Sequence, residues 1–268
     1  MLAVLLNGEP DVVRALIEAG ADIDAENDEG MTPLMWAVMT DTPDRENRVF
    51  SQEKEQKRIA IALDLIAGGA NVNITCFSPR WMKWTPLLFA SCEPDRNAPL
   101  ISSLISAGAG VNAGTMEDIT PLFHAAAYSR HSSTVRELIR AGAEVNAYGK
   151  EEGREGWTPL LYALASSCRS LPVVREILKS GADPNTAIRG GVTPLMFAAA
   201  IGDKPEFADV LLRAGADVYA LDSDGNSALD CAVAGNYKKI ADRLQRAWKN
   251  PVHRSRKTPA AIDTEAES

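Results

Sequence analysis

A chain of 268 residues with a formal net charge of −8 has the length of one or two globular domains. No apolar run approaches the roughly 20 residues of a membrane-spanning helix, and the first residues lack the pattern of a secretory signal. Because its four cysteines form no C-x-x-C pair, we expect free thiols in a reducing compartment. The expected location is the cytoplasm, although a mature periplasmic or secreted form would have the same features.

Two short signals alternate along the chain and predict the starts and ends of helix pairs. A threonine followed by proline and leucine predicts a start, since its oxygen can accept from free N–H groups and proline suits the first turn. A glycine followed by alanine predicts an end, since glycine adopts a left-handed cap without steric cost. The starts are Thr32, Thr85, Thr120, Thr158, Thr193 and, weakened, Ser227. The ends are Gly20, Gly69, Gly108, Gly142, Gly181 and Gly215.

The spacing of these signals indicates a repeat. The starts at Thr193 and Ser227 are 34 positions apart, and each unit reads helix, turn, helix, glycine stop and extended loop. A period near 33 residues that combines Thr-Pro-Leu, Gly-Ala and Val-Asn resembles the ankyrin repeat. The resemblance covers roughly residues 1–248 and implies an all-α solenoid of about seven helix-turn-helix units with projecting β-hairpin-like fingers.

The resemblance has one recurrent departure. The histidine that follows Thr-Pro-Leu in the family is replaced in every copy, which puts its hydrogen bonds between repeats in doubt. The replacements are Met35, Leu88, Phe123, Leu161, Met196 and Asp230. The predicted units are about 1–26, 27–75, 76–114, 115–148, 149–187, 188–221 and 222–248. We expect them to form one elongated domain of residues 1–248, followed by a disordered tail at 249–268.

The first unit lacks a start signal. Met1 falls where the leucine of Thr-Pro-Leu should stand, and residues 2–6 are apolar nearly all round, whereas a terminal repeat should show polar residues outward. Either upstream sequence is missing or a partner covers this end, and self-association through it is also open. Residues 1–30 carry eight acidic residues and one arginine, whereas residues 238–257 carry eight basic residues and one aspartate. This gradient either steers a partner or reflects polar end caps.

The second unit contains the largest departure in spacing. Thr32 and Gly69 are 37 positions apart, whereas Thr120 and Gly142 are 22 apart, so fifteen extra residues lie between its helices. The glutamate and lysine content of residues 52–58 predicts an N-terminal extension of the second helix. Insertions in repeat families often lie on a binding face. For residues 41–58, a binding role and a merely solvated loop both remain open.

Two of the loops between consecutive units are four residues longer than the rest. The distance from stop glycine to next start is 16 after Gly69 and Gly142, and 12 in the ordinary cases. In ankyrin-like folds these loops are fingers that project toward the concave side, and tryptophan, arginine and methionine are enriched at interface centres. The candidate partner-binding residues are Trp81, Met82, Trp84, Met116, Ile119, Arg154, Trp157 and Arg189.

Packing is an alternative explanation for some of these aromatic residues. The position before each start is apolar in five of six copies, so Trp84 and Trp157 either pack on a neighbouring finger or contact a partner. Trp81 and Met82 lie nearer the finger tip, which favours an interface role. A parallel series inside the first helices is predicted to pack in the core. It comprises Trp36, Phe89, His124, Tyr162, Phe197 and Cys231.

The last predicted element is an amphipathic capping helix from Tyr237 to Trp248. Ile240, Leu244 and Trp248 recur every fourth residue among basic residues, and Pro251 follows. Residues 252–268 are polar apart from a few small residues, and we expect them to be disordered.

Motifs for catalysis and metal binding are absent from the sequence. Histidine occurs only at positions 124, 131 and 253, with no zinc spacing, EF-hand loop, G-x-S-x-G elbow, phosphate loop or dinucleotide fingerprint. We therefore predict no catalytic residue, no cofactor and no metal.

Two functions from different classes remain. The resemblance implies a non-catalytic module that binds a protein partner through its concave face and finger tips, as a scaffold, inhibitor, or effector or immunity adaptor. The alternative is an adaptor for nucleic acid or an anionic surface that uses the basic residues 238–257, with an affinity that falls steeply with salt. The overall acidity and the lack of aromatic residues among those charges favour the first function.

Overall fold

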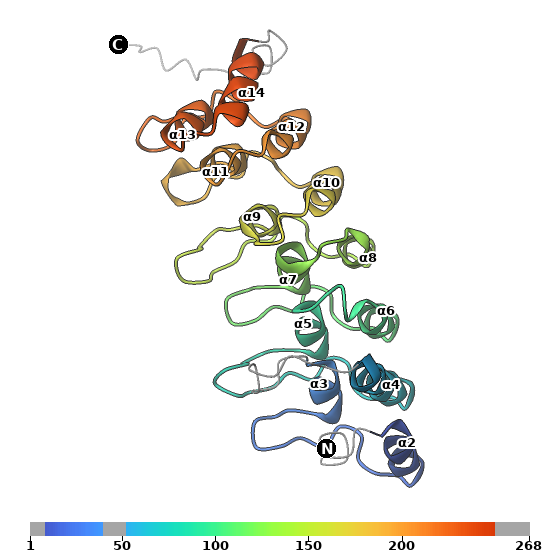
Figure 1. The fold of residues 1–268 in the computed structure, drawn as a ribbon. Helices are drawn as coiled ribbons and strands as arrows, with labels where there is room; N and C mark the ends of the chain where they lie inside the picture. The colour runs from blue at the N-terminus through green and yellow to red at the C-terminus, as the bar shows by residue number, and fades with distance from the viewer. Residues whose placement is uncertain (1–8, 40–51, 250–268) are drawn as a thin grey trace, which may run out of the picture. The chain divides into compact units, whose positions relative to one another are not determined.

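The computed structural model describes residues 9–39 and 52–249, which contain thirteen α-helices, one short 3-10 helix and no strand (Figure 1). The chain forms two compact units, Met1–Asp183 and Pro184–Ser268. The predicted all-α class is confirmed. Whether the repeats behave as a single domain stays a prediction.

The helices of the first compact unit form two columns (Figure 1). One column contains the helices that follow the threonine starts: α3 (Pro33–Val38), α5 (Pro86–Ser91), α7 (Pro121–Tyr128) and α9 (Pro159–Ala165). The other contains α2 (Pro10–Glu18), α4 (Gln52–Ala67), α6 (Ala98–Ser106), α8 (Ser133–Arg140) and α10 (Leu171–Lys179). Each helix packs on the next in its column, so one repeat covers the next as expected for a helical solenoid.

The second compact unit repeats this arrangement. It contains η1 (Arg189–Gly191), α11 (Pro194–Ala200), α12 (Pro205–Arg213), α13 (Ala228–Ala234) and α14 (Lys238–Lys249). α11 packs on α13, and α12 packs on α14. The predicted capping helix is therefore confirmed as α14, with Ile240 and Leu244 fully buried. The predicted tail, residues 250–268, and the apolar residues 2–6 lie outside the described residues.

The start and stop signals act as predicted. The side-chain oxygens of Thr32, Thr85, Thr158 and Thr193 each accept a hydrogen bond, 3.3 to 3.4 Å long, from the backbone N–H three residues on. Thr120 is the exception, because its buried hydroxyl has no hydrogen-bond partner within residues 9–39 and 52–249. All six stop glycines have a φ between +78° and +100°, where a side chain would be strained.

Asparagine side chains join consecutive repeats by hydrogen bonds. Each donates its amide to the carbonyl of the next stop glycine and accepts from the backbone N–H two residues beyond it. The donated bonds run from Asn73 to Gly108, Asn112 to Gly142, Asn146 to Gly181 and Asn185 to Gly215, at 2.9 to 3.1 Å. The accepted bonds come from Gly110, Glu144, Asp183 and Asp217, at 2.7 to 2.9 Å. We call this series the asparagine ladder.

Five of the six positions that lack the family's histidine are apolar and closed to solvent, and the sixth, Asp230, is exposed. Met35, Leu88, Phe123 and Leu161 are fully buried, and Met196 is 1% exposed. These five side chains pack in the core, and polar bonds between repeats are made elsewhere, by the asparagine ladder among others. Hydrogen bonds between repeats, which the loss of the histidine put in doubt, are therefore present at the loops and at the ends of the second helices.

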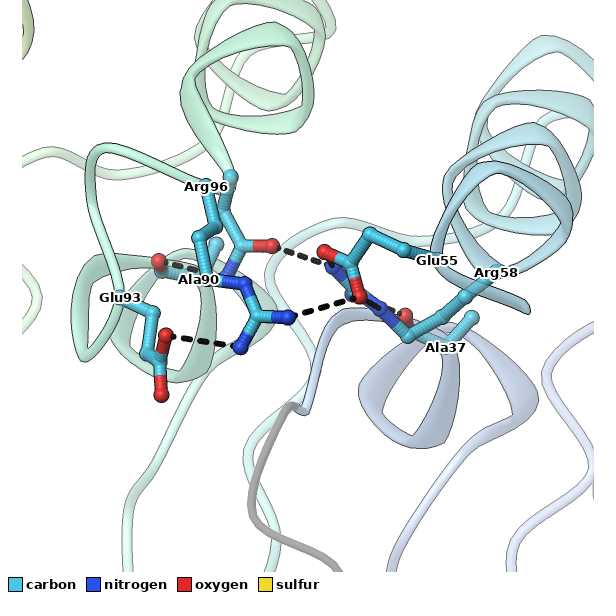
Figure 2. Close-up of polar contacts among 7 residues, drawn as sticks. Ala37, Glu55, Arg58, Ala90, Glu93 and Arg96 are labelled. Atoms are coloured by element: carbon cyan, nitrogen blue, oxygen red, sulfur yellow. Dashed lines mark hydrogen bonds and ion pairs between the residues drawn. The ribbon is translucent and has the colours of Figure 1, made fainter. Parts of the chain in front are cut away.

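The predicted extension of the second helix in repeat two is confirmed, since α4 begins at Gln52 and spans 16 residues. Arg58, in its second turn, donates to the Ala37 carbonyl at 2.8 Å, to Glu55 at 2.7 Å and to the Asn97 side-chain oxygen at 2.7 Å (Figure 2). Asn97 is fully buried and donates to the Ala90 carbonyl at 3.0 Å. The extended start of α4 is therefore tied to α3, to α5 and to the loop before α6.

Arg96 adds two ion pairs to this network, with Glu55 at 3.6 Å and Glu93 at 3.3 Å (Figure 2). The Arg96 side chain is 41% exposed, so these pairs contribute little to stability. Residues 40–51 of the insertion lie outside the described residues, and a binding role for residues 41–58 stays a prediction.

Candidate docking surface

The two long fingers are closed hairpins held by backbone hydrogen bonds. In the first, the Cys76 N–H donates to the Trp84 carbonyl at 3.1 Å, and the Lys83 N–H donates back to Cys76 at 2.9 Å. In the second, Gly149 and Trp157 are joined at 2.9 Å, and the Gly156 N–H donates to Gly149 at 2.9 Å. These bonds fix the direction of the tryptophans at the finger bases.

Aromatic rings from two consecutive repeats form a continuous series beside the first long finger. The ring centroid of Trp84 lies 4.7 Å from Trp81, 5.0 Å from Phe89 and 5.2 Å from His124. His124 stacks on Tyr128 with a centroid distance of 6.1 Å and an angle of 15° between the ring planes. Edge and tilted contacts of this kind add to the hydrophobic gain of packing.

These rings line two adjoining hollows of about 930 and 770 Å³. Trp84, His124 and Tyr128 line both hollows, so the two hollows share a wall. Trp81 and Phe89 line the larger hollow, and Tyr162 lines the smaller one. We call this surface the aromatic groove, defined by Trp81, Trp84, Phe89, His124, Tyr128 and Tyr162.

His124 is the polar group at the centre of the groove. Its Nε2 is closed to solvent and has no hydrogen-bond partner within the described residues. Burial lowers its pKa from 6.5 to about 4, since the charged ring would lose its hydration. The ring is therefore neutral at pH 7.

Charged residues border the smaller hollow. Arg154 lies over the rings of Trp157 and Tyr162, 5.4 Å from each centroid, and pairs with Glu151 at 3.3 Å. The Tyr162 hydroxyl donates to the Glu151 carboxylate. Burial, and then this hydrogen bond, raise the pKa of Tyr162 well above its usual value. At the second long finger, the side of the groove is thus held by contacts among Arg154, Glu151 and the rings of Trp157 and Tyr162.

The structure places the predicted partner-binding residues in several environments. Trp81 and Trp84 line the groove, whereas Met82 and Met116 are 44% and 52% exposed outside it. Ile119 lines the smaller hollow but is only 6% exposed.

Ile119 packs against Gly149 of the next finger, where an added Cβ would lie 2.7 Å from its Cδ1. Arg154 and Trp157 lie at the second long finger, beside the smaller hollow. Arg189 is exposed on η1 in the second compact unit. The partner contacts themselves stay predictions.

Sequence reasoning missed the floor of the groove. Phe89 and Tyr162 are buried, 2% and 9% exposed, as their predicted core role requires, but both line a hollow. His124 is half-buried and Tyr128, one turn further along α7, is 52% exposed. The sequence signal for these residues was their position in the first helix of the repeat. Phe89, His124 and Tyr162 stand four residues after the start threonine, and Tyr128 stands eight residues after it.

The described residues contain no group of three or more histidine, cysteine, aspartate or glutamate side chains arranged to hold a metal ion. The four cysteines are free, as predicted. Among the helices of residues 9–39 and 52–249, none combines the length and apolar character required to span a bilayer.

A stack of short helix pairs with hairpin fingers and an aromatic groove defines a helical repeat protein. The sequence profile for ankyrin repeats (3 copies) matches residues 90–188 and 165–250, and the profile for ankyrin repeats (many copies) matches residues 1–45. The chain belongs to the ankyrin-repeat family. That family consists generally of non-catalytic protein-interaction modules.

Curated relatives with ankyrin repeats are of very different lengths. The mouse protein "Neurogenic locus notch homolog protein 1" is 33% identical over 166 residues, which are 57% of this chain and 6% of that protein. "Putative ankyrin repeat protein YahD" of Escherichia coli K12 is 28% identical over 218 residues, 78% of this chain and 92% of that protein. The chain thus spans only a small part of the Notch relatives.

Proposed function

We propose that this chain binds a protein partner through the aromatic groove and the two long fingers beside it. The observation that supports the proposal is the series of rings from Trp81 to Tyr128, which crosses two repeats and borders open hollows. Aromatic side chains are the most frequent energetic anchors of protein interfaces. The groove therefore offers several anchors at fixed spacing.

The exposed apolar residues of the same repeats support this location. Phe77, Met82 and Met116 lie on the fingers and are 44% to 56% exposed, and Tyr128 lies in the groove at 52%. Apolar residues gathered around a hollow are typical of an interaction surface. We infer a partner segment that inserts apolar side chains into the groove and lies against the fingers.

The test uses a matched pair of tyrosines. Tyr128 is 52% exposed and lines both hollows, whereas Tyr148 is 56% exposed and lines neither. Affinity capture with the wild-type chain, followed by mass spectrometry, identifies the partners, and titration measures each affinity. Tyr128→Ala is expected to weaken binding by about 30-fold, since loss of a central aromatic anchor costs about 2 kcal/mol or more.

Tyr148→Ala is the control and is expected to leave the affinity within about twofold, as for a residue outside an interface centre. Trp81→Ala is the second groove variant, because its ring packs on Trp84 and Phe89. Circular dichroism checks that each variant is folded. Equal binding by Tyr128→Ala and the wild type would refute the groove as the docking site.

The same titration separates this function from the alternative at the basic end. On α14, Lys238, Lys239, Arg246 and Lys249 are exposed, while Arg243 pairs with Asp209. If the chain were an adaptor for nucleic acid or an anionic surface, affinity would fall by orders of magnitude between low and moderate salt. For binding through the groove we expect a small dependence on salt, since its floor is aromatic.

A further inference from the structure

The smaller hollow of the aromatic groove is lined by charged residues as well as by rings. All the residues that line it lie between positions 80 and 167, within one continuous described stretch of the chain. Its charged residues are Arg80, Glu117, Lys150, Glu151, Glu152 and Arg154. The chemistry of the group that this hollow can receive depends on which of these charges already have a partner inside the protein.

The cations of this lining are engaged within the protein. Lys150 and Arg154 each pair with a neighbouring carboxylate, at 2.7 and 3.3 Å. The Arg80 guanidinium lies over the ring of Trp81, 4.8 Å from its centroid. The charges of Lys150 and Arg154 are therefore balanced, and that of Arg80 lies against a ring.

Two carboxylates of the lining have no cation beside them. Glu117 and Glu152 are exposed, and neither forms an ion pair within residues 9–39 and 52–249. The Glu117 carboxylate accepts a hydrogen bond from the Thr115 hydroxyl at 2.8 Å, and a carboxylate has room for several such bonds. Apart from Arg80, the charges of the hollow that remain available to a partner are therefore negative.

Contacts between fingers hold these two carboxylates on joined segments. The Lys150 N–H donates to the Glu117 carbonyl at 2.7 Å, which joins the finger of residues 109–119 to the second long finger. The ion pair of Lys150 with Asp118 strengthens the same junction. Glu152 lies two residues beyond Lys150, so the two carboxylates that line the hollow come from segments that are bonded to each other.

The rings that line this hollow can attract a cation. Trp84, His124 and Tyr128 are among them, and Tyr128 is 52% exposed. The face of an aromatic ring is negative and attracts a cation placed within about 6 Å of its centroid. The His124 ring does not repel such a cation, because burial lowers its pKa to about 4 and leaves the ring neutral at pH 7.

The protein already holds guanidinium groups against rings of the groove and its border. Arg80 lies over Trp81, and Arg154 lies 5.4 Å from the ring centroids of Trp157 and Tyr162. A guanidinium is planar, so it can stack on a ring and also donate two parallel N–H bonds to a carboxylate. The smaller hollow combines rings with available carboxylates, and this combination suits a guanidinium.

We propose that the smaller hollow receives an arginine side chain of the partner protein, with its guanidinium stacked on Trp84 or Tyr128 and paired with Glu117 or Glu152. This inference rests on the proposed function, because it names the side chain by which the groove recognises its partner. Apolar residues beside the arginine contact the other rings. An acidic side chain at the same place is excluded, since both carboxylates repel it.

Selection from a displayed library of random peptides tests the proposal with the immobilised full chain. Peptides of about 12 residues reach about 40 Å when extended, which exceeds the two helix spacings of about 10 Å each between α5 and α9. We expect the selected peptides to be enriched in arginine with apolar neighbours. Fluorescence anisotropy then measures the affinity of one selected peptide and of its variants.

Replacement of the peptide's arginine measures what the guanidinium contributes. Glutamine in its place is expected to weaken binding about tenfold, because the cation-π contact and the bond to a carboxylate are both lost. Lysine is expected to weaken binding about threefold, since an ammonium keeps the charge but neither stacks as a plane nor donates two parallel bonds. Equal affinity of the arginine and glutamine peptides would overturn the proposal.

The double variant Glu117→Gln and Glu152→Gln removes the two carboxylates and keeps the size of each side chain. It is expected to bind the arginine peptide about tenfold more weakly, and the glutamine peptide within about twofold of the wild type. Glu144→Gln with Glu155→Gln is the matched control, since both are exposed acids that line neither hollow. The control should bind both peptides as the wild type does, and circular dichroism checks each fold.

An equal loss of affinity for both peptides in the Glu117 and Glu152 double variant would contradict the proposed pairing. The groove variant Tyr128→Ala separates this inference from the proposed function. If the selected peptides lacked arginine but bound Tyr128→Ala more weakly, the groove would be a docking site and the arginine inference would be wrong. If they contained arginine but bound Tyr128→Ala as well as the wild type, both would be wrong. Failure to enrich any peptide would also contradict both.

Discussion

The asparagine ladder and the aromatic groove occur in the same repeats, but they differ in whether their polar groups have hydrogen-bond partners. In the ladder, each asparagine both donates and accepts a hydrogen bond to the next repeat. In the groove, the buried Nε2 of His124 has no hydrogen-bond partner among the residues that the structure describes, and the Tyr128 ring is half exposed. The polar groups of the ladder are paired, whereas the groove presents aromatic surface, which the proposed function assigns to partner binding.

The largest expected effect is a loss of stability at acid pH that is caused by the buried His124 ring. Its folded pKa is about 4 and its unfolded pKa is near 6.5, so below pH 6.5 the unfolded chain takes up a proton that the folded ring does not. The free energy of unfolding should therefore fall as pH decreases from about 6.5 to 4, by up to about 3 kcal/mol. Urea titrations at pH 7 and pH 5 measure the difference.

The control for this prediction is His124→Phe, which should remove the part of the pH dependence between pH 7 and pH 5. His131→Asn, at an exposed histidine of the same hollow, should keep it. Hydrogen bonds to arginine and lysine lower the pKa of Glu176 and Asp118, and those carboxylates lose their contribution only at lower pH. An unchanged pH dependence in His124→Phe would contradict the prediction.

The next largest expected effect is the loss of stability when an asparagine of the ladder is removed. Asn112→Ala removes the bonds to Gly142 and Glu144, at 2.9 Å each, and is expected to destabilise the fold by about 1 to 2 kcal/mol. Binding of the partner should be unchanged once the variant is folded. A loss of partner affinity without a loss of stability in this variant would break the distinction between ladder and groove.

A gain-of-stability variant at the ladder complements this loss. Asp24 stands at the asparagine position of the first repeat and accepts from the Asn71 N–H at 2.9 Å, but a carboxylate has no amide to donate. Asp24→Asn would add the missing donor opposite Gly69. We expect stabilisation of about 0.5 to 1 kcal/mol in urea unfolding. Glu26→Gln, a matched neutralisation of an exposed acid, should change stability less.

The smallest expected effect is the difference in stability loss between alanine variants of two start threonines. The Thr85 hydroxyl accepts from the Leu88 N–H at 3.3 Å, so Thr85→Ala is expected to cost about 1 kcal/mol. Thr120→Ala should cost less, because the buried Thr120 hydroxyl has no partner to lose in the described part of the chain. Thermal unfolding of the two variants measures both values. Equal losses would show that Thr120 caps its helix in solution.

The sequence predicted the helices well because their signals are local. Thr32 and Thr85 cap helices that begin at the next residue, and the stop glycines adopt the left-handed conformation that such ends require. The elongated helix of repeat two was also readable from residues 52–58. Caps, turns and periodicity act within a few residues, so a single sequence contains them.

The groove was only partly readable, because it depends on contacts between repeats. Trp81 was singled out from composition, but the ring of Phe89 and the half-burial of His124 depend on how two repeats align. The contact of Arg58 with Asn97 joins residues 39 positions apart and has no sequence signal. Such contacts follow from the register of the stack rather than from any local pattern.

The asparagine ladder has a direction, and the first repeat is its weakest member. Every asparagine reaches forward to the following stop glycine, while Asp24 offers an acceptor alone. The helix beside it, α2, also has Val12 and Leu16 in water. Amide protons of repeat one should therefore exchange with solvent ahead of those in repeats three and four, so that opening of the first compact unit proceeds from its amino-terminal repeat inward.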